Sequence, residues 1–105
     1  MDRVIEEIKK FNEERDWGKF HTPANLAKSI SIEAAELLEC FQWNEDNFNI
    51  QEVYEELADV FTYCFQMAIT LNISPEEIIL KKLEKTKQKY PVNKSKGKST
   101  KYDKL

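Results

Sequence analysis

The chain has 105 residues, which is enough for one small domain. Hydrophobic residues make up 41% and charged residues 33%, which excludes a disordered chain, and the scarcity of glycine and proline, two and three residues, disfavours an all-β fold. The net charge of −3 is unevenly distributed, because residues 1–80 carry 17 acidic and 6 basic residues whereas residues 81–105 carry 2 acidic residues and 10 lysines.

Four helical segments and no strand are predicted. The first covers residues 2–15 and the third about 51–71, because apolar residues recur there at helical spacing. The second, over about 22–41, and the fourth, over 74–90, each begin with a capping hydroxyl followed by proline, which is favoured at the first helical position. The apolar face of the third helix is expected to comprise Val53, Leu57, Val60, Cys64, Met67 and Leu71.

The Lys/Ser-rich residues 92–105 are predicted to have no regular structure of their own. The chain therefore divides into a helical domain, 1–91, and a flexible basic tail, 92–105. A four-helix bundle of this size buries little core alone, so we expect chains to associate. Cys40 and Cys64 lie in apolar helical stretches and are interpreted as reduced core residues. Without an apolar leader or a run of membrane-spanning length, a cytoplasmic protein is expected.

Two acidic pairs of the same form, Glu33-x-x-Glu36 and Glu56-x-x-Asp59, lie on the second and third predicted helices. Residues three apart share a helix face, so each pair projects its carboxylates to one side, beside an apolar stripe. If the two helices face each other, four carboxylates converge and require a compensating cation. A hard divalent metal, which prefers oxygen ligands, is the simplest one.

The helical projection extends each pair with an aromatic residue, because Trp43 falls nearly in line with Glu36, and Tyr63 with Glu56 and Asp59. Such a cluster suits a nucleotide, since cations bind phosphates and flat rings bind a base. The Glu-x-x-His motifs of di-iron bundles and a Cys/His cluster for zinc are both missing, which leaves Mg²⁺ or Mn²⁺.

Two alternatives remain open at this point. Glu-rich helices are commonly solvated faces, and the chain is then a non-catalytic helical interaction module with a basic tail. The tail would also suit a sequence-independent nucleic-acid binder, although the charge of −11 on residues 1–80 would repel phosphates. By their type alone, the lone His21 is a surface or capping residue, and Trp17 and Trp43 are hydrophobic anchors.

The stretch SIEAAELLE, residues 31–39, followed by EELADV, residues 55–60, resembles the E-x-x-E…E-x-x-D signature of the MazG-like nucleoside triphosphate pyrophosphohydrolases, which have an all-α fold. The resemblance continues through ERDW at 14–17, FQW at 41–43 and KYP at 89–91, and ends in STKY at 99–102. It covers nearly the whole chain and is strongest to the dCTP pyrophosphatase branch.

The resemblance implies a four-helix MazG-like bundle, assembled as a homotetramer of two dimers. It implies a Mg²⁺-dependent reaction, with Mn²⁺ as a substitute, that cleaves a deoxynucleoside triphosphate (dCTP or a modified pyrimidine nucleotide) to the monophosphate and pyrophosphate. The expected partner is therefore a nucleotide, rather than nucleic acid or a membrane.

The same resemblance assigns roles to individual residues. The implied metal ligands are Glu33, Glu36, Glu56 and Asp59. Independently of the resemblance, we expect Glu33 or Glu36 to be the general base, because the acids of the third helix can hold a metal alone. The implied base and sugar pocket comprises Trp17, His21, Trp43 and Tyr63. Positions of phosphate-contacting, lid or other ligand-contacting residues are occupied by Lys82, Thr86, Lys89, Lys101 and Tyr102. Thr86 stands where the dCTP branch has asparagine, which leaves the preferred base open.

Overall fold

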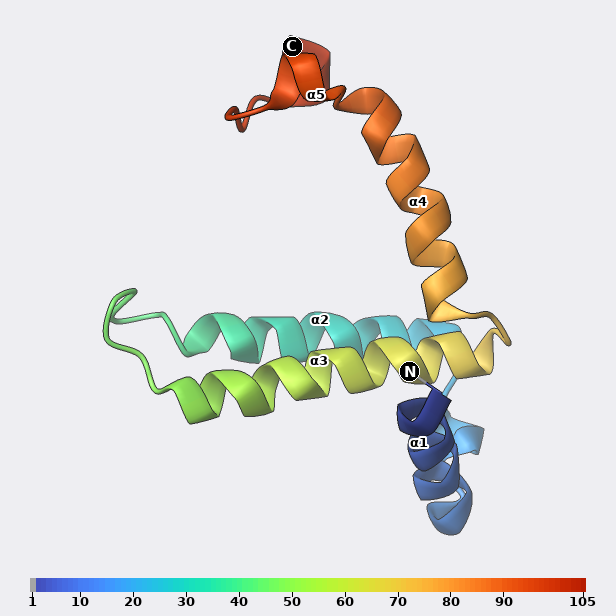
Figure 1. The fold of residues 1–105 in the computed structure, drawn as a ribbon. Helices are drawn as coiled ribbons and strands as arrows, with labels where there is room; N and C mark the ends of the chain where they lie inside the picture. The colour runs from blue at the N-terminus through green and yellow to red at the C-terminus, as the bar shows by residue number, and fades with distance from the viewer. Residues whose placement is uncertain (1) are drawn as a thin grey trace. The chain divides into compact units, whose positions relative to one another are not determined.

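The structure, a computed structural model, describes residues 2–105, which form helices joined by loops without a strand (Figure 1). The α-helices are α1 (Asp2–Arg15), α2 (Pro23–Glu39), α3 (Ile50–Thr70), α4 (Pro75–Lys89) and α5 (Val92–Ser95), and the 3₁₀-helices are η1 (Gly18–Phe20) and η2 (Tyr102–Lys104). The four longer helices lie within two residues of their predicted bounds. The all-α prediction is confirmed. No helix among residues 2–105 is long and apolar enough to span a membrane.

Side-chain caps begin α2, α3 and α4. The hydroxyls of Thr22 and Ser74 each accept the backbone N–H three residues further on, at 3.1 and 3.3 Å. The carboxamide oxygen of Asn49 accepts two N–H groups of the first turn of α3, at 3.0 and 3.3 Å. These bonds satisfy N–H groups that have no partner inside the helix, so the helix starts are encoded locally.

The chain forms two compact units, one ending at Ile73 and the other comprising Ser74–Leu105. In the first unit α2 and α3 pack side by side as an antiparallel hairpin, and α1 packs against α3 (Figure 1). Residues 40–49 join the two long helices, and the rings of Phe41 and Phe48 meet there with centroids 4.8 Å apart. The hairpin therefore brings the two acid-bearing helices together.

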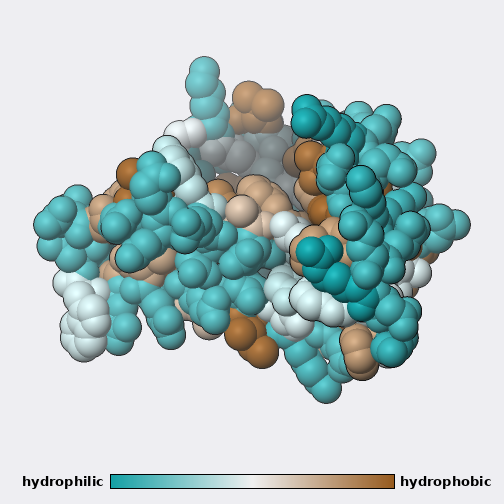
Figure 2. Space-filling model, turned by 90° about the horizontal axis from the view of Figure 1, so that it is seen from below, coloured by the Kyte–Doolittle hydropathy of each residue, from teal (hydrophilic) through white to brown (hydrophobic). Residues whose placement is uncertain are grey.

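The apolar core of one chain is small. Leu26 and Ala68, at 1% and 5% exposure, are the buried apolar residues of α2 and α3, and Pro75 is buried at the start of α4. Large apolar side chains on α2 and α3 are exposed instead: Ile32, Leu38, Tyr54 and Phe61. Figure 2 shows such hydrophobic side chains at the surface, scattered among hydrophilic ones. One chain thus leaves more of its large hydrophobic side chains exposed than buried, and association of chains would cover them.

The predicted apolar face of α3 is wrong at two positions. Cys64 and Leu71 are exposed, and the residues buried on α3 are Gln66 and Ala68. Gln66 is buried because α1 packs against α3 on a side that the spacing of apolar residues did not indicate. Both cysteines are free, but Cys64 is not a core residue.

The second unit contains α4 and the basic tail. The prediction that the tail lacks regular structure is wrong, because it contains α5 and η2. The chain bends at Gly97, whose φ of +77° suits glycine. Beyond this bend the backbone N–H of Tyr102 donates to the Tyr90 hydroxyl at 3.1 Å, and the two rings meet edge to face with centroids 6.0 Å apart. The Lys89 ammonium lies 4.6 Å from the Tyr102 ring centroid. These aromatic contacts hold the tail against the end of α4.

Candidate metal centre

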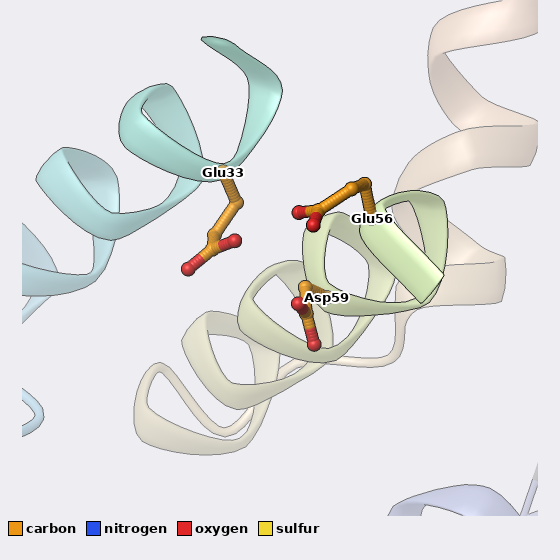
Figure 3. Close-up of side chains that lie close together, drawn as sticks. All are labelled: Glu33, Glu56 and Asp59. Carbon is orange, nitrogen blue, oxygen red and sulfur yellow. The ribbon is translucent and has the colours of Figure 1, made fainter. Parts of the chain in front are cut away.

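Glu33 of the first acidic pair faces Glu56 and Asp59 of the second across the α2–α3 hairpin (Figure 3). Glu33 projects from α2, and Glu56 and Asp59 project from successive turns of α3. One carboxylate oxygen from each of these three residues lies within 4.8 Å of the other two. Glu33 and Glu56 are half-buried, whereas Asp59 is exposed. The hairpin therefore builds the convergent carboxylates that the sequence predicted.

Two oxygens of the cluster have no hydrogen-bond donor, and no cationic side chain among the described residues pairs with its acids. The Oε2 atoms of Glu33 and Glu56 are buried and accept no hydrogen bond. None of the ion pairs among the described residues involves these acids. Two carboxylates that are drawn out of water beside a third one repel each other, and each favours its protonated form.

The pKa values reflect this crowding. The pKa of Glu33 rises from 4.5 to about 7, chiefly because it shares a hydrogen bond with Glu36, and further through burial and the negative charges of Glu36, Asp59 and Glu56. The pKa of Glu56 also rises, first because of burial and then through its hydrogen bond to Glu36 and the nearby acids.

The cluster has the chemistry to bind a hard divalent cation. Its three carboxylates offer only oxygen atoms as ligands, which Mg²⁺ and Mn²⁺ prefer. Two of these carboxylates also have a buried oxygen that accepts no hydrogen bond. Glu36, three residues after Glu33 on α2, is not one of the three residues whose oxygens lie within 4.8 Å of one another. Three of the four predicted carboxylates therefore converge, and the fourth follows Glu33 by about one turn of α2.

The predicted base-pocket residues separate into two groups in one chain. Trp17 and His21 lie on either side of η1, between α1 and α2, and the His21 carbonyl accepts a hydrogen bond from Thr70 of α3. Trp43 lies in the loop after α2 and is 88% exposed. The 17-residue α2 separates them by about 25 Å at its usual rise per residue. Tyr63, half-buried on α3, follows Asp59 by one turn. A single chain therefore does not bring Trp43 to Trp17 and His21.

The predicted phosphate-side residues all lie in the second unit. Lys82, Lys89 and Lys101 are exposed, and Lys89 faces the Tyr102 ring. The Thr86 hydroxyl donates to the backbone carbonyl of Lys82 at 3.1 Å, so its proton is used inside α4.

The sequence did not predict a buried pair of amides, Asn12 and Gln66, because isolated polar residues on amphipathic helices give no pattern.

Comparison with known proteins shows the family to which this chain is related. The sequence model of the MazG-like family matches residues 28–105. The proteins named dCTP pyrophosphatase 1 from Mus musculus and Homo sapiens are each 32% identical over 115 residues, which covers 97% of this chain and 68% of the relative. A pyrophosphatase from Archaeoglobus fulgidus, known from a crystal structure, matches with a TM-score of 0.77 and 40% identity, and the match covers 87% of this chain and 92% of that one.

The fold and these relationships define a nucleotide pyrophosphohydrolase, which is an enzyme. More narrowly, the chain belongs to the MazG-like family. The alternative of a non-catalytic helical module is thereby disfavoured.

Proposed function

We propose that the protein is a Mg²⁺-dependent nucleoside triphosphate diphosphatase, which converts dCTP or a modified pyrimidine deoxynucleoside triphosphate to the monophosphate and pyrophosphate. The observation that carries the proposal is the pair of buried, donorless oxygens of Glu33 and Glu56 beside Asp59. This cluster needs positive charge, which Mg²⁺ would supply while it also binds the phosphates of the nucleotide. The relatives named dCTP pyrophosphatase 1 support the choice of base.

In this proposal Glu33, Glu56 and Asp59 hold the cation, with Glu36 beside them. Mg²⁺ bound there would neutralise charge on the phosphates and lower the pKa of water. Of the two candidate bases, Glu33 and Glu36, the geometry favours Glu36, because it lies outside the three-oxygen group and follows Glu33 by about one turn of α2. It would take the proton from the water that attacks the α-phosphorus as pyrophosphate leaves.

The base and sugar pocket is proposed to comprise Trp17, His21, Trp43 and Tyr63. Because Trp43 lies at the opposite end of α2 from Trp17 and His21, a pocket containing all of them needs two chains. The exposed apolar residues of α2 and α3 support such an assembly, for which we propose the homotetramer built from two dimers.

The second unit is proposed to serve the phosphates. Lys82, Lys89, Lys101 and Tyr102 would contact the triphosphate, with residues 92–105 acting as a lid on the helical domain of residues 1–91. The ten lysines of residues 81–105 support this assignment, because they concentrate positive charge where a polyanion is bound. Since the Thr86 proton is used inside α4, we propose that Thr86 only accepts hydrogen bonds from the substrate.

The test is incubation with Mg²⁺ and a panel of the four deoxynucleoside triphosphates and 5-substituted dCTP. Pyrophosphate should be released, and heavy oxygen from labelled water should appear in the monophosphate. Glu36→Gln and Asp59→Asn should abolish the reaction, whereas Glu45→Gln, in the exposed loop after α2, should retain it. Release of orthophosphate, or full activity of Glu36→Gln and Asp59→Asn, would contradict the proposal.

A further inference from the structure

Two polar side chains are buried between α1 and α3. Gln66 is 4% exposed and Asn12 is 9% exposed, and both lie outside the acidic cluster. The Nε2 atom of Gln66 donates a hydrogen bond to Oδ1 of Asn12 at 3.2 Å, across 54 residues of sequence. The remaining amide oxygen of Gln66 is buried and has no donor. A pair of apolar side chains would fill this position without desolvating two amides, so packing alone does not explain why polar residues occupy it.

Asn12 is tied in turn to the segment that carries Trp17 and His21. Its backbone carbonyl accepts the Trp17 N–H at 3.0 Å. The Trp17 ring meets Phe11, next to Asn12, edge to face with centroids 5.3 Å apart. One turn beyond Gln66, the Thr70 hydroxyl donates to the His21 carbonyl at 3.3 Å. Gln66 therefore holds the start of this segment, at Trp17, through Asn12, and Thr70 holds its end, at His21.

Gln66 and Thr70 lie on the same side of α3 as Glu56 and Asp59, the proposed metal ligands. Glu56, Asp59, Tyr63, Gln66 and Thr70 follow one another at spacings of three and four residues, which places them along one side of the helix. Gln66 lies seven residues beyond Asp59, or about 10 Å along the axis. A helix of this length is rigid, so the bonds of Gln66 and Thr70 fix the Trp17–His21 segment at a set distance from the acids.

We infer that Asn12 and Gln66 are positioning residues, whose buried amide pair sets the Trp17–His21 segment against Glu56 and Asp59 and thereby aligns the base of the nucleotide with its phosphates. The inference rests on the proposed function, since it takes Trp17 and His21 as base-pocket residues. A hydrogen bond suits this role because it requires a narrow range of distance and angle, which an apolar contact does not.

The experiment compares Gln66→Leu, Asn12→Ala and the double variant with Thr62→Ala as control. Thr62 lies one turn before Gln66 and donates only to the Ala58 carbonyl of its own helix. For each variant, kcat and KM are measured with all four deoxynucleoside triphosphates, together with the melting temperature. We expect the two single variants to raise KM for the preferred nucleotide by about tenfold or more and to reduce discrimination between bases, with kcat changed less than about twofold.

The double variant separates positioning from stability. A single substitution leaves a buried amide unpaired, whereas the double variant removes both amides and should recover part of the lost melting temperature. Base discrimination should remain lost. If the double variant recovers both stability and discrimination, or if the folded variants all keep the wild-type KM and base preference, the inference is wrong. A wild-type protein that releases no pyrophosphate from any nucleotide would instead overturn the proposed function.

Discussion

Glu33 on α2 and Glu56 on α3 each bring a buried carboxylate oxygen to the hairpin interface, and neither oxygen accepts a hydrogen bond from the described residues. Buried polar atoms are normally paired, because an unpaired one keeps the cost of leaving water. Two such atoms beside Asp59 therefore form a position whose chemistry suits a cation.

Divalent metal should stabilise the protein. At a Mg²⁺ concentration about a hundredfold above the dissociation constant, the gain is about 2.7 kcal/mol, or a rise in melting temperature on the order of 10 °C for a domain of this size. Thermal melts with Mg²⁺, Mn²⁺ and a chelator measure it. Asp59→Asn should lose the rise and Glu45→Gln should keep it, and an equal rise in Asp59→Asn would contradict the assignment of Asp59 as a ligand.

The metal-free protein should become less stable as the pH rises from about 4.5 to about 7. The pKa of Glu33 is raised to about 7 in the folded chain, so the folded state holds a proton that the unfolded state, at 4.5, has released. The stabilising contribution of this proton is complete below 4.5 and is lost as the pH passes the folded value. Urea unfolding across this pH range should show that the free energy of unfolding falls as the pH rises, and Glu33→Gln should reduce that fall.

Saturating Mg²⁺ should reverse this slope, because protons and the cation compete for the same carboxylates. Chelator-treated and Mg²⁺-loaded samples of the wild type, melted side by side at each pH, provide the comparison. Parallel profiles in the two samples would show that the cation binds elsewhere.

Assembly should depend on the exposed apolar residues of α2. Leu38 is 70% exposed in one chain, and Leu38→Glu places a charge where a second copy is expected. Light scattering should give a multiple of 12.4 kDa for the wild type, four in the proposed tetramer, and a smaller species for Leu38→Glu. Glu39→Gln, at the neighbouring exposed position, is the matched control. A wild-type monomer at micromolar concentration would contradict the assembly.

The tail should be held by Tyr102. Tyr102→Ala removes the ring that meets Tyr90 and Lys89, so trypsin should cleave the lysines of residues 94–101 faster. Tyr90→Phe keeps the ring contact but removes the hydroxyl that accepts the Tyr102 N–H, and should give an intermediate rate. Tyr54→Phe, on exposed α3 surface, should cleave like the wild type. Unchanged cleavage in Tyr102→Ala would show that the aromatic contact does not hold the tail.

The sequence predicts the helices well because their starts are local. Thr22-Pro23 and Ser74-Pro75 carry the cap and the proline that begin a helix, and the structure has both caps. The acidic cluster was predictable for a related reason, since three-residue spacing fixes the face of each pair. That Glu36 falls outside the three convergent oxygens was not predictable, because it depends on the rotation of α2 against α3.

The remaining features depend on contacts distant in sequence or on short aromatic contacts. The burial of Gln66 requires α1 to pack on one side of α3, which no apolar period specified. The helical turns of the tail depend on Tyr102 meeting Tyr90, and single aromatic residues give no periodic signal. Cys64 is exposed although its spacing places it with Val60 and Met67, because burial depends on which sides of α3 the other helices cover.

The stripe of α3 from Glu56 to Thr70 constrains how this chain can change in length. Insertion of one residue between Asp59 and Gln66 would turn everything beyond it by about 100°, so that the amide pair would no longer face α1. Insertion of seven residues would nearly restore the direction in which Gln66 points but would lengthen the distance between Asp59 and Gln66 by about 10 Å. Relatives that act on nucleotides of the same size should therefore vary in the loop at residues 40–49 and in the tail, and keep the spacing from residue 56 to residue 70 without gaps.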